Sequence, residues 1–221
     1  MLPQEFIDLT RMVENGMPVF PGHPSTCITR YLTCEADGRN VEQISFGSHS
    51  GTHVDVPYHF LKGGNTAETI SLEAISGRAL LLDFSHKKNE CISVADLAGE
   101  KERIERYQKM VIRTDWARGG DFDYHSYPFL SLESAQWLAG MNLQLIALDS
   151  PSPGPYGRLG AEIHRLLLRN RIYIIEGLTN LWRIRTDIFF LLCLPLLLMG
   201  TGGAPCRAVA LSDINKDFTN E

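Results

Sequence analysis

Short apolar segments, separated by turns that contain glycine and proline, recur along the whole chain. Each segment is short enough to form one strand, and several are apolar throughout, which is typical of strands covered on both faces. The pattern predicts strands at residues 6–9, 27–32, 41–46, 79–84, 110–114, 143–148, 172–175, 191–199 and 207–211.

Helical spacing of apolar residues occurs in three segments, at residues 93–97, 131–139 and 159–170. In the second segment, Ser131 can cap the helix and Glu133 places a negative charge in its first turn. Charges of both signs are dense between residues 87 and 109, which indicates a solvated surface rather than a binding patch. For the third segment we predict a stripe that faces the core, made of Leu159, Ile163, Leu166 and Leu167.

The length of 221 residues suits one large domain. Hydrophobic residues make up 44% and charged residues 21%, a balance that is ordinary for a globular protein and excludes a disordered one. No repeat, low-complexity tract or linker divides the sequence. Because predicted strands outnumber predicted helices along one chain, we expect a single α/β domain over residues 1–221, with a strand-rich mixed sheet at its core and a few flanking helices.

Charge and hydropathy limit the partners that this chain can have. The net charge of −5 and the pI near 5.8 argue against nucleic acid as a partner. The most apolar stretch, residues 188–199, is shorter than the ~20 residues that span a bilayer, so we expect no membrane association. Without a signal peptide at its start, the protein is expected to be cytoplasmic. The five cysteines lack paired spacing, which predicts reduced thiols that are buried or half-buried.

Residues 48–60 hold the strongest candidate for chemistry. Three of the seven histidines, His49, His53 and His59, lie here together with Asp55, all at odd-numbered positions. In an extended chain the side chains alternate between two faces, so His53, Asp55 and His59 would project to one side. Imidazole nitrogen and carboxylate oxygen are the ligands expected of Zn²⁺, Mn²⁺ or Fe²⁺. The pattern therefore favours a metal site over ordinary hydrogen-bonded histidines.

The first and last histidines of this segment can share one site only if the chain bends. A straight strand would place His49 and His59 about 33 Å apart, at ~3.3 Å per residue. Gly51 and Pro57 permit such a bend and also disfavour a helix over these residues.

A second candidate cluster lies far along the chain. Glu176 ends a continuous apolar run and precedes Gly177, so its carboxylate needs a cation or hydrogen-bond donors if it is buried. His164 lies beside the apolar stripe of the third predicted helix. Each residue could also be structural, Glu176 as an ion-paired strand end and His164 as an exposed or capping histidine.

The pattern His-x-Gly-Thr-His-x-Asp-x-Pro-x-His at residues 49–59 resembles the signature of the cyclase family, whose best-known activity is kynurenine formamidase (arylformamidase). The resemblance implies a cyclase-like fold of the swivelling β/β/α type and assembly as a homodimer or homotetramer. It covers nearly the whole chain in the family's order, through further likenesses at residues 6–10, 19–22, 112–116, 148–152, 164–181, 194–196 and 203–208.

This resemblance implies a centre of two zinc ions, with manganese as the alternative metal. The implied ligands of one ion are His49, His53, Asp55 and Glu176. Those of the other are Asp55, His164 and Glu176. Both carboxylates would then bridge, which allows two cations to lie roughly 3.5–4 Å apart.

The implied reaction is hydrolysis of an amide bond in a small-molecule substrate. Water activated by the metal would attack the carbonyl carbon, and His59 would act as proton donor and acceptor, which suits an imidazole pKa near ~6.5. Phe20 would line the substrate pocket. The sequence contains neither a Gly-x-Ser-x-Gly elbow nor a His-Glu-x-x-His motif that would suggest another hydrolytic mechanism.

Departures from the family pattern leave the substrate open. Phe20 stands where the formamidases commonly have tryptophan, His23 where they have aspartate, and Gly202-Gly203 where Asp-Gly is frequent. We expect an aryl formamidase that acts on a substrate such as N-formylkynurenine. The alternatives are a sister hydrolase that opens isatin or another small cyclic amide or lactone, and a catalytically silent metal- or ligand-binding protein of the same fold. His86 and His125 are expected at the surface, whereas His23 follows the turn that lines the pocket.

Overall fold

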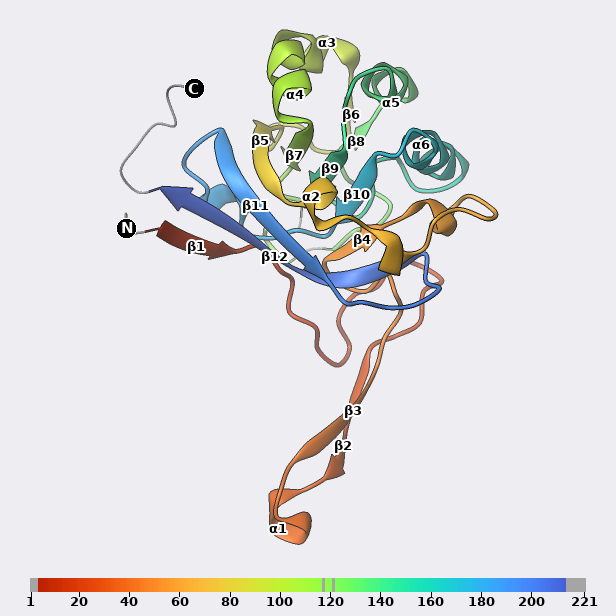
Figure 1. The fold of residues 1–221 in the computed structure, drawn as a ribbon, viewed down its shortest axis with the longest axis vertical. Coiled ribbons are helices and arrows are strands. Elements are labelled where there is room, and N and C mark those ends of the chain that lie inside the picture. The colour runs from red at the N-terminus through yellow and green to blue at the C-terminus, as the bar shows by residue number, and fades with distance from the viewer. Residues whose placement is uncertain (1–3, 117, 121, 214–221) are drawn as a thin grey trace.

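The computed structural model describes residues 4–116, 118–120 and 122–213. An eight-stranded mixed sheet lies at its centre, and seven of the strands close into a barrel-like ring (Figure 1). In order around the ring these are β4 (His53–Asp55), β12 (Gly203–Asp213), β11 (Ile188–Pro195), β5 (Gly77–Asp83), β7 (Lys109–Arg113), β9 (Leu145–Leu148) and β10 (Tyr173–Glu176). The eighth strand, β1 (Gln4–Asp8), pairs with the far end of β12. The expected α/β fold with a strand-rich core is confirmed, although residues 1–3 and 214–221 of the predicted domain lie outside the described residues.

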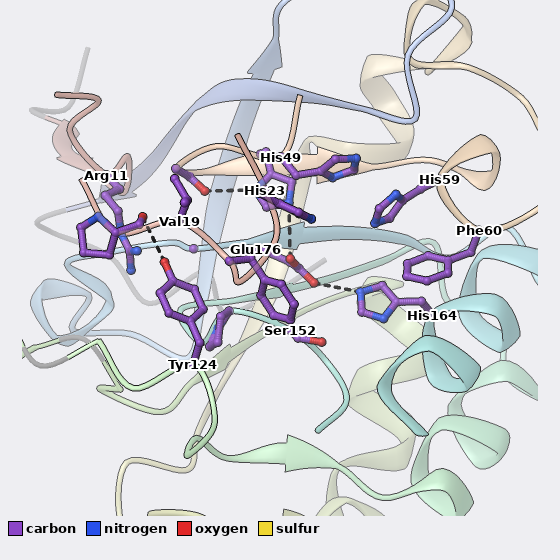
Figure 2. Close-up of a pocket in the computed structure, with 16 residues that line it drawn as sticks. Arg11, Val19, His23, His49, His59, Phe60, Tyr124, Ser152, His164 and Glu176 are labelled. Atoms are coloured by element: carbon purple, nitrogen blue, oxygen red, sulfur yellow. Dashed lines mark hydrogen bonds and ion pairs between the residues drawn. The ribbon is translucent and has the colours of Figure 1, made fainter. Parts of the chain in front are cut away.

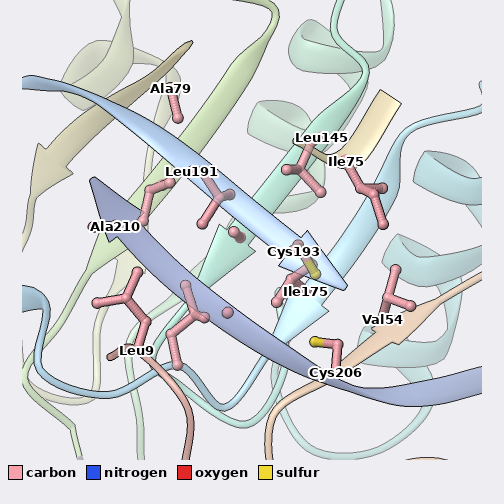
Figure 3. Packing of buried hydrophobic residues seen from close by; sticks show 14 of the residues in the cluster. Leu9, Val54, Ile75, Ala79, Leu145, Ile175, Leu191, Cys193, Cys206 and Ala210 are labelled. Carbon is pink, nitrogen blue, oxygen red and sulfur yellow. The ribbon is translucent and has the colours of Figure 1, made fainter. Parts of the chain in front are cut away.

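Strands β5, β7, β9 and β10 are parallel neighbours and are buried on both faces. Alternate residues such as Val111 and Ala147 belong to the core inside the ring, which β11 and β12 complete (Figure 3). Met110 and Ile146 point the other way and belong to a second core beneath the helices. Burial on both faces explains why these strands are continuous apolar runs in the sequence.

Helices α5 (Leu132–Ala139) and α6 (Arg158–Arg169) pack over the outer face of the parallel strands (Figure 1). The predicted cap is confirmed, because the Ser131 side chain accepts a hydrogen bond from the backbone N–H of Ser134. The charged region forms a solvated layer of α3 (Val94–Leu97), η3 (Ala98–Glu100) and α4 (Lys101–Tyr107), as predicted.

The predicted core stripe of α6 is partly wrong. Leu159 is 40% exposed and Leu166 is only partly buried, whereas His164 and Leu168 lie on the buried face beside Ile163 and Leu167. The reason is the close approach of the helix at Gly160, where a Cβ atom would lie 2.1 Å from the carbonyl oxygen of Pro155. This contact turns the Gly160 side of the helix inward and leaves the neighbouring Leu159 in solvent.

A β-hairpin projects from the body of the protein (Figure 1). It consists of β2 (Cys27–Leu32) and β3 (Val41–Ser45), joined through the short helix α1 (Cys34–Asp37). Both strands were predicted, but they lie outside the core and their residues are mostly exposed. The remaining elements are short: η1 (Pro57–His59), η2 (Ala67–Thr69), α2 (Leu72–Ile75), β6 (Cys91–Ile92), β8 (Phe129–Leu130) and η4 (Leu181–Arg183).

Two further expectations need correction. The strand predicted over residues 191–199 is β11 and ends at Pro195, where the chain turns towards β12. The cysteines are reduced, but only Cys193 and Cys206 are buried, because Cys27, Cys34 and Cys91 lie on the exposed hairpin and on a short surface strand. No helix in the described ranges combines the length and the hydropathy needed to cross a bilayer.

Candidate metal centre

Strand β4 lies between β10 and β12 and places the first two candidate ligands. His53 is directly opposite Glu176 of β10, and Asp55 is opposite Gly203 of β12. Because side chains alternate along a strand, His53 and Asp55 share one face, while Val54 between them enters the apolar core. The predicted one-sided arrangement of His53 and Asp55 is therefore present, and it places Glu176 beside them.

The turn before β4 brings in His49. Gly51 has a φ of +64°, a left-handed conformation that favours glycine, so the chain bends at the predicted position. The turn packs tightly on the end of β10, since a Cβ atom at Gly177 would lie 2.7 Å from the carbonyl oxygen of Gly51. His49 Nδ1 then lies 2.7 Å from Asp55 Oδ1.

His59 reaches the cluster by a different route from the one predicted. The chain is not extended there, because a turn of 3₁₀ helix runs from Pro57 to His59 after the short strand β4 has ended. This turn places the His59 ring against the His49 ring, with centroids 3.8 Å apart, and His59 Nε2 4.0 Å from Asp55 Oδ2. The predicted bend at Pro57 is thus real, but it takes the form of a helical turn.

Helix α6 supplies His164 to the same cluster. Its Nδ1 is 2.8 Å from the carbonyl oxygen of Gly160, one turn earlier, and this contact fixes the ring orientation. Nε2 then lies 3.0 Å from Glu176 Oε1 and 3.6 Å from Asp55 Oδ2. The side chain is buried, so the alternative of an exposed or capping histidine is wrong.

The two carboxylates divide their oxygens between two sets of histidines. On one side, Oδ1 of Asp55 faces His49 and His53, the latter at 3.4 Å, and Oε2 of Glu176 is 3.3 Å from His53 Nε2. On the other side, Oδ2 of Asp55 and Oε1 of Glu176 both face His164. Each carboxylate therefore contributes one oxygen to each half of the cluster.

Two buried polar atoms of the cluster without hydrogen-bond partners among the described residues indicate that its residues suit a metal. His53 Nε2 and Asp55 Oδ2 are buried and have no hydrogen-bond partner in the described part of the chain. Buried polar atoms left unpaired are costly, and metal coordination satisfies such atoms. Nitrogen and carboxylate donors in this number fit a divalent cation such as zinc or manganese. Two sets of ligand atoms lie within 4.8 Å of one another: His49, Asp55 and His59, and His53, Asp55 and Glu176.

The pKa values of the residues in the cluster also indicate that the site favours positive charge. Burial opposes a charge on His53, but the carboxylates of Asp55 and Glu176 that face its Nε2 outweigh it and raise the pKa of His53 well above its usual range. Burial likewise opposes a charge on His164, and Glu176 raises its pKa. The histidines, with His49 first, hold the pKa of Asp55 well below its usual range despite burial. A divalent cation would displace these protons from the imidazole rings.

His59 differs from the other histidines in its electrostatics. Burial, together with the nearby His49 and His164, lowers the pKa of His59 to about 4, although Asp55 acts in the opposite direction. Its imidazole is therefore neutral near pH 7 and can accept a proton. Its side chain is also more exposed than that of His164, at 23% against 9%, so it faces the pocket more openly.

Two consecutive glycines leave the space that the histidines need. A Cβ atom at Gly203 would lie 2.6 Å from Cε1 of His49, and one at Gly202 would lie 2.9 Å from Cα of His59. A Cβ atom at Gly203 would therefore press on the His49 ring and on the backbone of β4, and one at Gly202 would press on the backbone of His59. Gly203 therefore leaves room for the His49 ring, and Gly202 lets the backbone of η1 pack closely against the chain before β12.

The cluster forms the floor of a pocket with aromatic walls (Figure 2). Phe20 lines this pocket, and its ring contacts those of Tyr124 and Tyr156 at centroid distances of 5.7 and 5.6 Å. His23 also lines it, 5.8 Å from the His49 ring, as the sequence suggested. Phe60 completes the wall beside His164, at a centroid distance of 4.7 Å.

A model of the family described as "Putative cyclase" matches residues 7–155, more than half of the chain. The chain belongs to the cyclase family. Among its relatives, the kynurenine formamidase of Geobacillus thermodenitrificans is 30% identical over 208 residues, which cover 92% of this chain and 95% of the relative. The family predicted from the histidine motif is therefore confirmed.

Solved structures support the same assignment. A structure titled as a potential metal-dependent hydrolase with cyclase activity has a TM-score of 0.79 and 27% identity, and the match covers 97% of this chain and 100% of that one. Isatin hydrolase A from Labrenzia aggregata has a TM-score of 0.83 at 20% identity, with 95% and 94% covered, which shows a shared fold. The protein is a cyclase-family hydrolase with residues that can hold a metal.

In this cyclase-family chain the structure brings together every candidate site residue that the sequence singled out: His49, His53, Asp55, His59, His164, Glu176 and, at the pocket wall, Phe20. Arg11, Tyr124 and Ser152 also line the pocket and were not predicted from the sequence. These residues come from separate loops, and no spacing pattern connects them. The available signal was a basic residue, Arg11, two positions after the first apolar segment.

Proposed function

We propose that this protein is a metal-dependent hydrolase that cleaves the amide bond of an aryl formamide such as N-formylkynurenine. The observation that carries the proposal is the division of the Asp55 and Glu176 oxygens between two sets of histidines at the floor of an aromatic pocket. The kynurenine formamidase relatives support the reaction type.

Five residues would hold the metal: His49, His53, Asp55, His164 and Glu176. We propose two zinc ions, with manganese as the alternative. When bound, such ions polarise a carbonyl group and lower the pKa of water towards neutrality. The backbone carbonyls of Gly51 and Gly160 accept from Nδ1 of His53 and His164, so both rings present Nε2 to the cluster.

His59 is placed to move a proton. Its Nε2 lies beside the carboxylate of Asp55 at 4.0 Å, and its ring lines the pocket. The neutral imidazole can take a proton from water and deliver it to the nitrogen of the departing amine. Phe20 and Phe60 provide apolar surface for the aryl ring and limit the access of solvent.

The test combines metal content with turnover. Purified protein is analysed by inductively coupled plasma mass spectrometry and assayed with N-formylkynurenine and, in parallel, isatin. We expect close to two zinc ions per chain and formamide hydrolysis that stops after chelation and returns with zinc. One manganese ion with isatin opening and no formamide hydrolysis would replace the proposal with the sister hydrolase. Metal binding without turnover of either compound would indicate a silent binding protein.

A pair of variants makes the experiment specific to the site. Glu176→Gln replaces one of the two carboxylate oxygens, each of which serves one half of the cluster, and removes the negative charge that both halves share, so metal content and turnover should fall together. His86→Ala is the matched control, because His86 is exposed and lies outside the pocket. Equal losses in both variants would contradict the assigned site.

We also propose that the chain forms a homodimer or homotetramer. The projecting hairpin supports this proposal, because a two-stranded hairpin is marginally stable alone and this one exposes Tyr31 and Ile44 at 71% and 56%. Light scattering coupled to size-exclusion chromatography tests it. A monomer at micromolar concentration would contradict it.

A further inference from the structure

Arg11 lies in the pocket but takes no part in the metal cluster. It follows β1, and its backbone N–H donates to Thr52 Oγ1 at 2.8 Å, which anchors it to the turn before β4. In Figure 2 Arg11 lies with Val19 and Tyr124 at one end of the pocket, while His59 and Phe60 lie at the other. The pocket therefore has a histidine end and a guanidinium end.

The guanidinium group of Arg11 has no carboxylate partner. Among the described residues no acidic group lies within ion-pair distance of it, and its Nη2 is buried without a hydrogen bond. By contrast, Arg103, Arg113 and Arg207 each pair with an aspartate. A cation held out of water without an anion is costly, and burial lowers the pKa of Arg11.

The groups around Arg11 do not neutralise it. Its guanidinium carbon lies 4.6 Å from the centre of the Phe122 ring and 5.7 Å from that of Trp116. These rings offer a cation–π attraction but no acceptor oxygen. The Tyr124 side chain hydrogen-bonds with Arg11, and its hydroxyl donates to the carbonyl oxygen of Pro18; burial raises the pKa of Tyr124, so this group stays an uncharged phenol and supplies no negative charge.

We propose that Arg11 binds a carboxylate of the substrate, so that the pocket selects aryl formamides that carry an acidic group remote from the scissile bond. This inference rests on the proposed function and specifies its substrate class. A planar guanidinium group pairs with a carboxylate through two parallel hydrogen bonds, which fixes orientation as well as affinity. Binding of the acid at Arg11 would direct the formamide towards the metal ligands at the opposite end.

The charge at each end of the pocket and the aromatic surface between the ends both fit a substrate of this class. Its acidic lining residue, Glu176, belongs to the metal cluster at the opposite end, so the cation of Arg11 is left for a carboxylate of the substrate. Between the two ends, Phe20 and Tyr124 provide aromatic surface that suits a flat aryl ring. A neutral substrate of the same shape would leave the cation unpaired.

The test compares two substrates that differ only in charge: N-formylkynurenine and its α-carboxamide. With metal-loaded wild-type protein we expect kcat/KM to be about ten- to a hundredfold higher for the acid, as for a hydrogen-bonded charge pair. In Arg11→Gln this preference should vanish, chiefly through a higher KM for the acid. Arg11→Lys should retain part of it, because the charge remains but the paired hydrogen bonds do not.

A structural role for Arg11 predicts a different result. If Arg11 only held Trp116 and Phe122 in place, both substrates would lose activity by the same factor and the preference would survive. That outcome would overturn the proposal. Arg183→Gln is the matched control, because Arg183 is half exposed and pairs with Glu5 away from the pocket; its substrate preference should equal that of the wild type.

A binding measurement separates this proposal from the proposed function. Titration calorimetry of the metal-loaded protein with kynurenine and with its carboxamide needs no turnover. We expect the acid to lose about ten- to a hundredfold in affinity in Arg11→Gln while the amide is unchanged. If this loss is seen without formamide hydrolysis, the proposed function fails and the carboxylate site stands. If the acid binds both proteins equally, Arg11 is not a carboxylate site, whatever the turnover.

Discussion

Replacing Gly203 by alanine should disable the metal centre through one methyl group. The added Cβ would lie 2.6 Å from Cε1 of His49 and 2.8 Å from the carbonyl oxygen of Val54. Carbon atoms pack best at about 3.5–4.0 Å, so the contact with His49 is about 1 Å too short. The Val54 oxygen belongs to the backbone of β4, which pairs with β12 at this point, so rotation of a side chain cannot relieve that clash.

The His49 ring must therefore withdraw by about 1 Å, and β4 must separate from β12. Displacement of a metal ligand or of its support costs about 10–100-fold in metal affinity, and a misplacement of this size costs about a hundredfold in rate. Overpacking adds about 1–3 kcal/mol of destabilisation, which corresponds to a fall in Tm of about 2–12 °C at this chain length.

The assay is a zinc titration against a chromophoric chelator, together with calorimetric melting and kcat/KM for N-formylkynurenine. Gly99→Ala is the matched control, because a Cβ there would meet no atom within 4 Å. Gly202→Ala is the informative neighbour, since its Cβ would press on the backbone of His59 and should lower the rate while zinc affinity is largely kept. Wild-type zinc affinity and rate in Gly203→Ala would refute the reasoning.

Three further predictions concern the proton, the metal and pH. His59→Ala should lower kcat by about 10²–10⁴-fold while metal content stays at the wild-type value, and a parallel loss of metal would make His59 a ligand instead. Chelation should lower Tm, by an amount that grows with the logarithm of the free metal concentration before removal. The same Tm with and without metal would contradict binding of metal to the folded state. Burial raises the pKa of Asp149 to about 6 despite hydrogen bonds from Thr114 and Asp115. Since the ordinary pKa is ~3.9, the stability that this carboxyl contributes is present below pH ~4 and is lost as pH rises through about 6, by at most about 3 kcal/mol. In urea denaturation the stability of the wild type relative to Asp149→Asn should therefore fall between pH 4 and pH 7, and a constant difference would contradict it.

The parallel strands could be predicted from the sequence because burial on both faces leaves a continuous apolar run. Met110, Val111 and Ile112 alternate between two cores, and both cores are apolar, so the residue types alone marked β7 as a strand. The cap at Ser131 was also predictable, because the interaction involves a residue only three positions away. Such local signals depend little on the rest of the fold.

The ligands of the cluster were predictable for a different reason. His53 and Asp55 share a face through strand alternation alone, and Glu176 stood out as a carboxylate at the end of an apolar run. The route of His59 was not predictable, because it depends on where β12 stops pairing with β4. Arg11 was missed because its importance comes from having no ion-paired carboxylate among the described residues, which spacing along the chain cannot show.

The pairing of β4 with β12 also sets the time at which the site can form during synthesis. It joins Asp55, in the first quarter of the chain, to Gly203, in its last tenth. Contacts between residues so far apart form late, since the chain entropy of closing such a loop must be overcome first. A nascent chain therefore carries His53 and Asp55 on an incomplete strand edge until the final strand emerges from the ribosome. Tight metal binding would then report that β12 has closed the ring of strands.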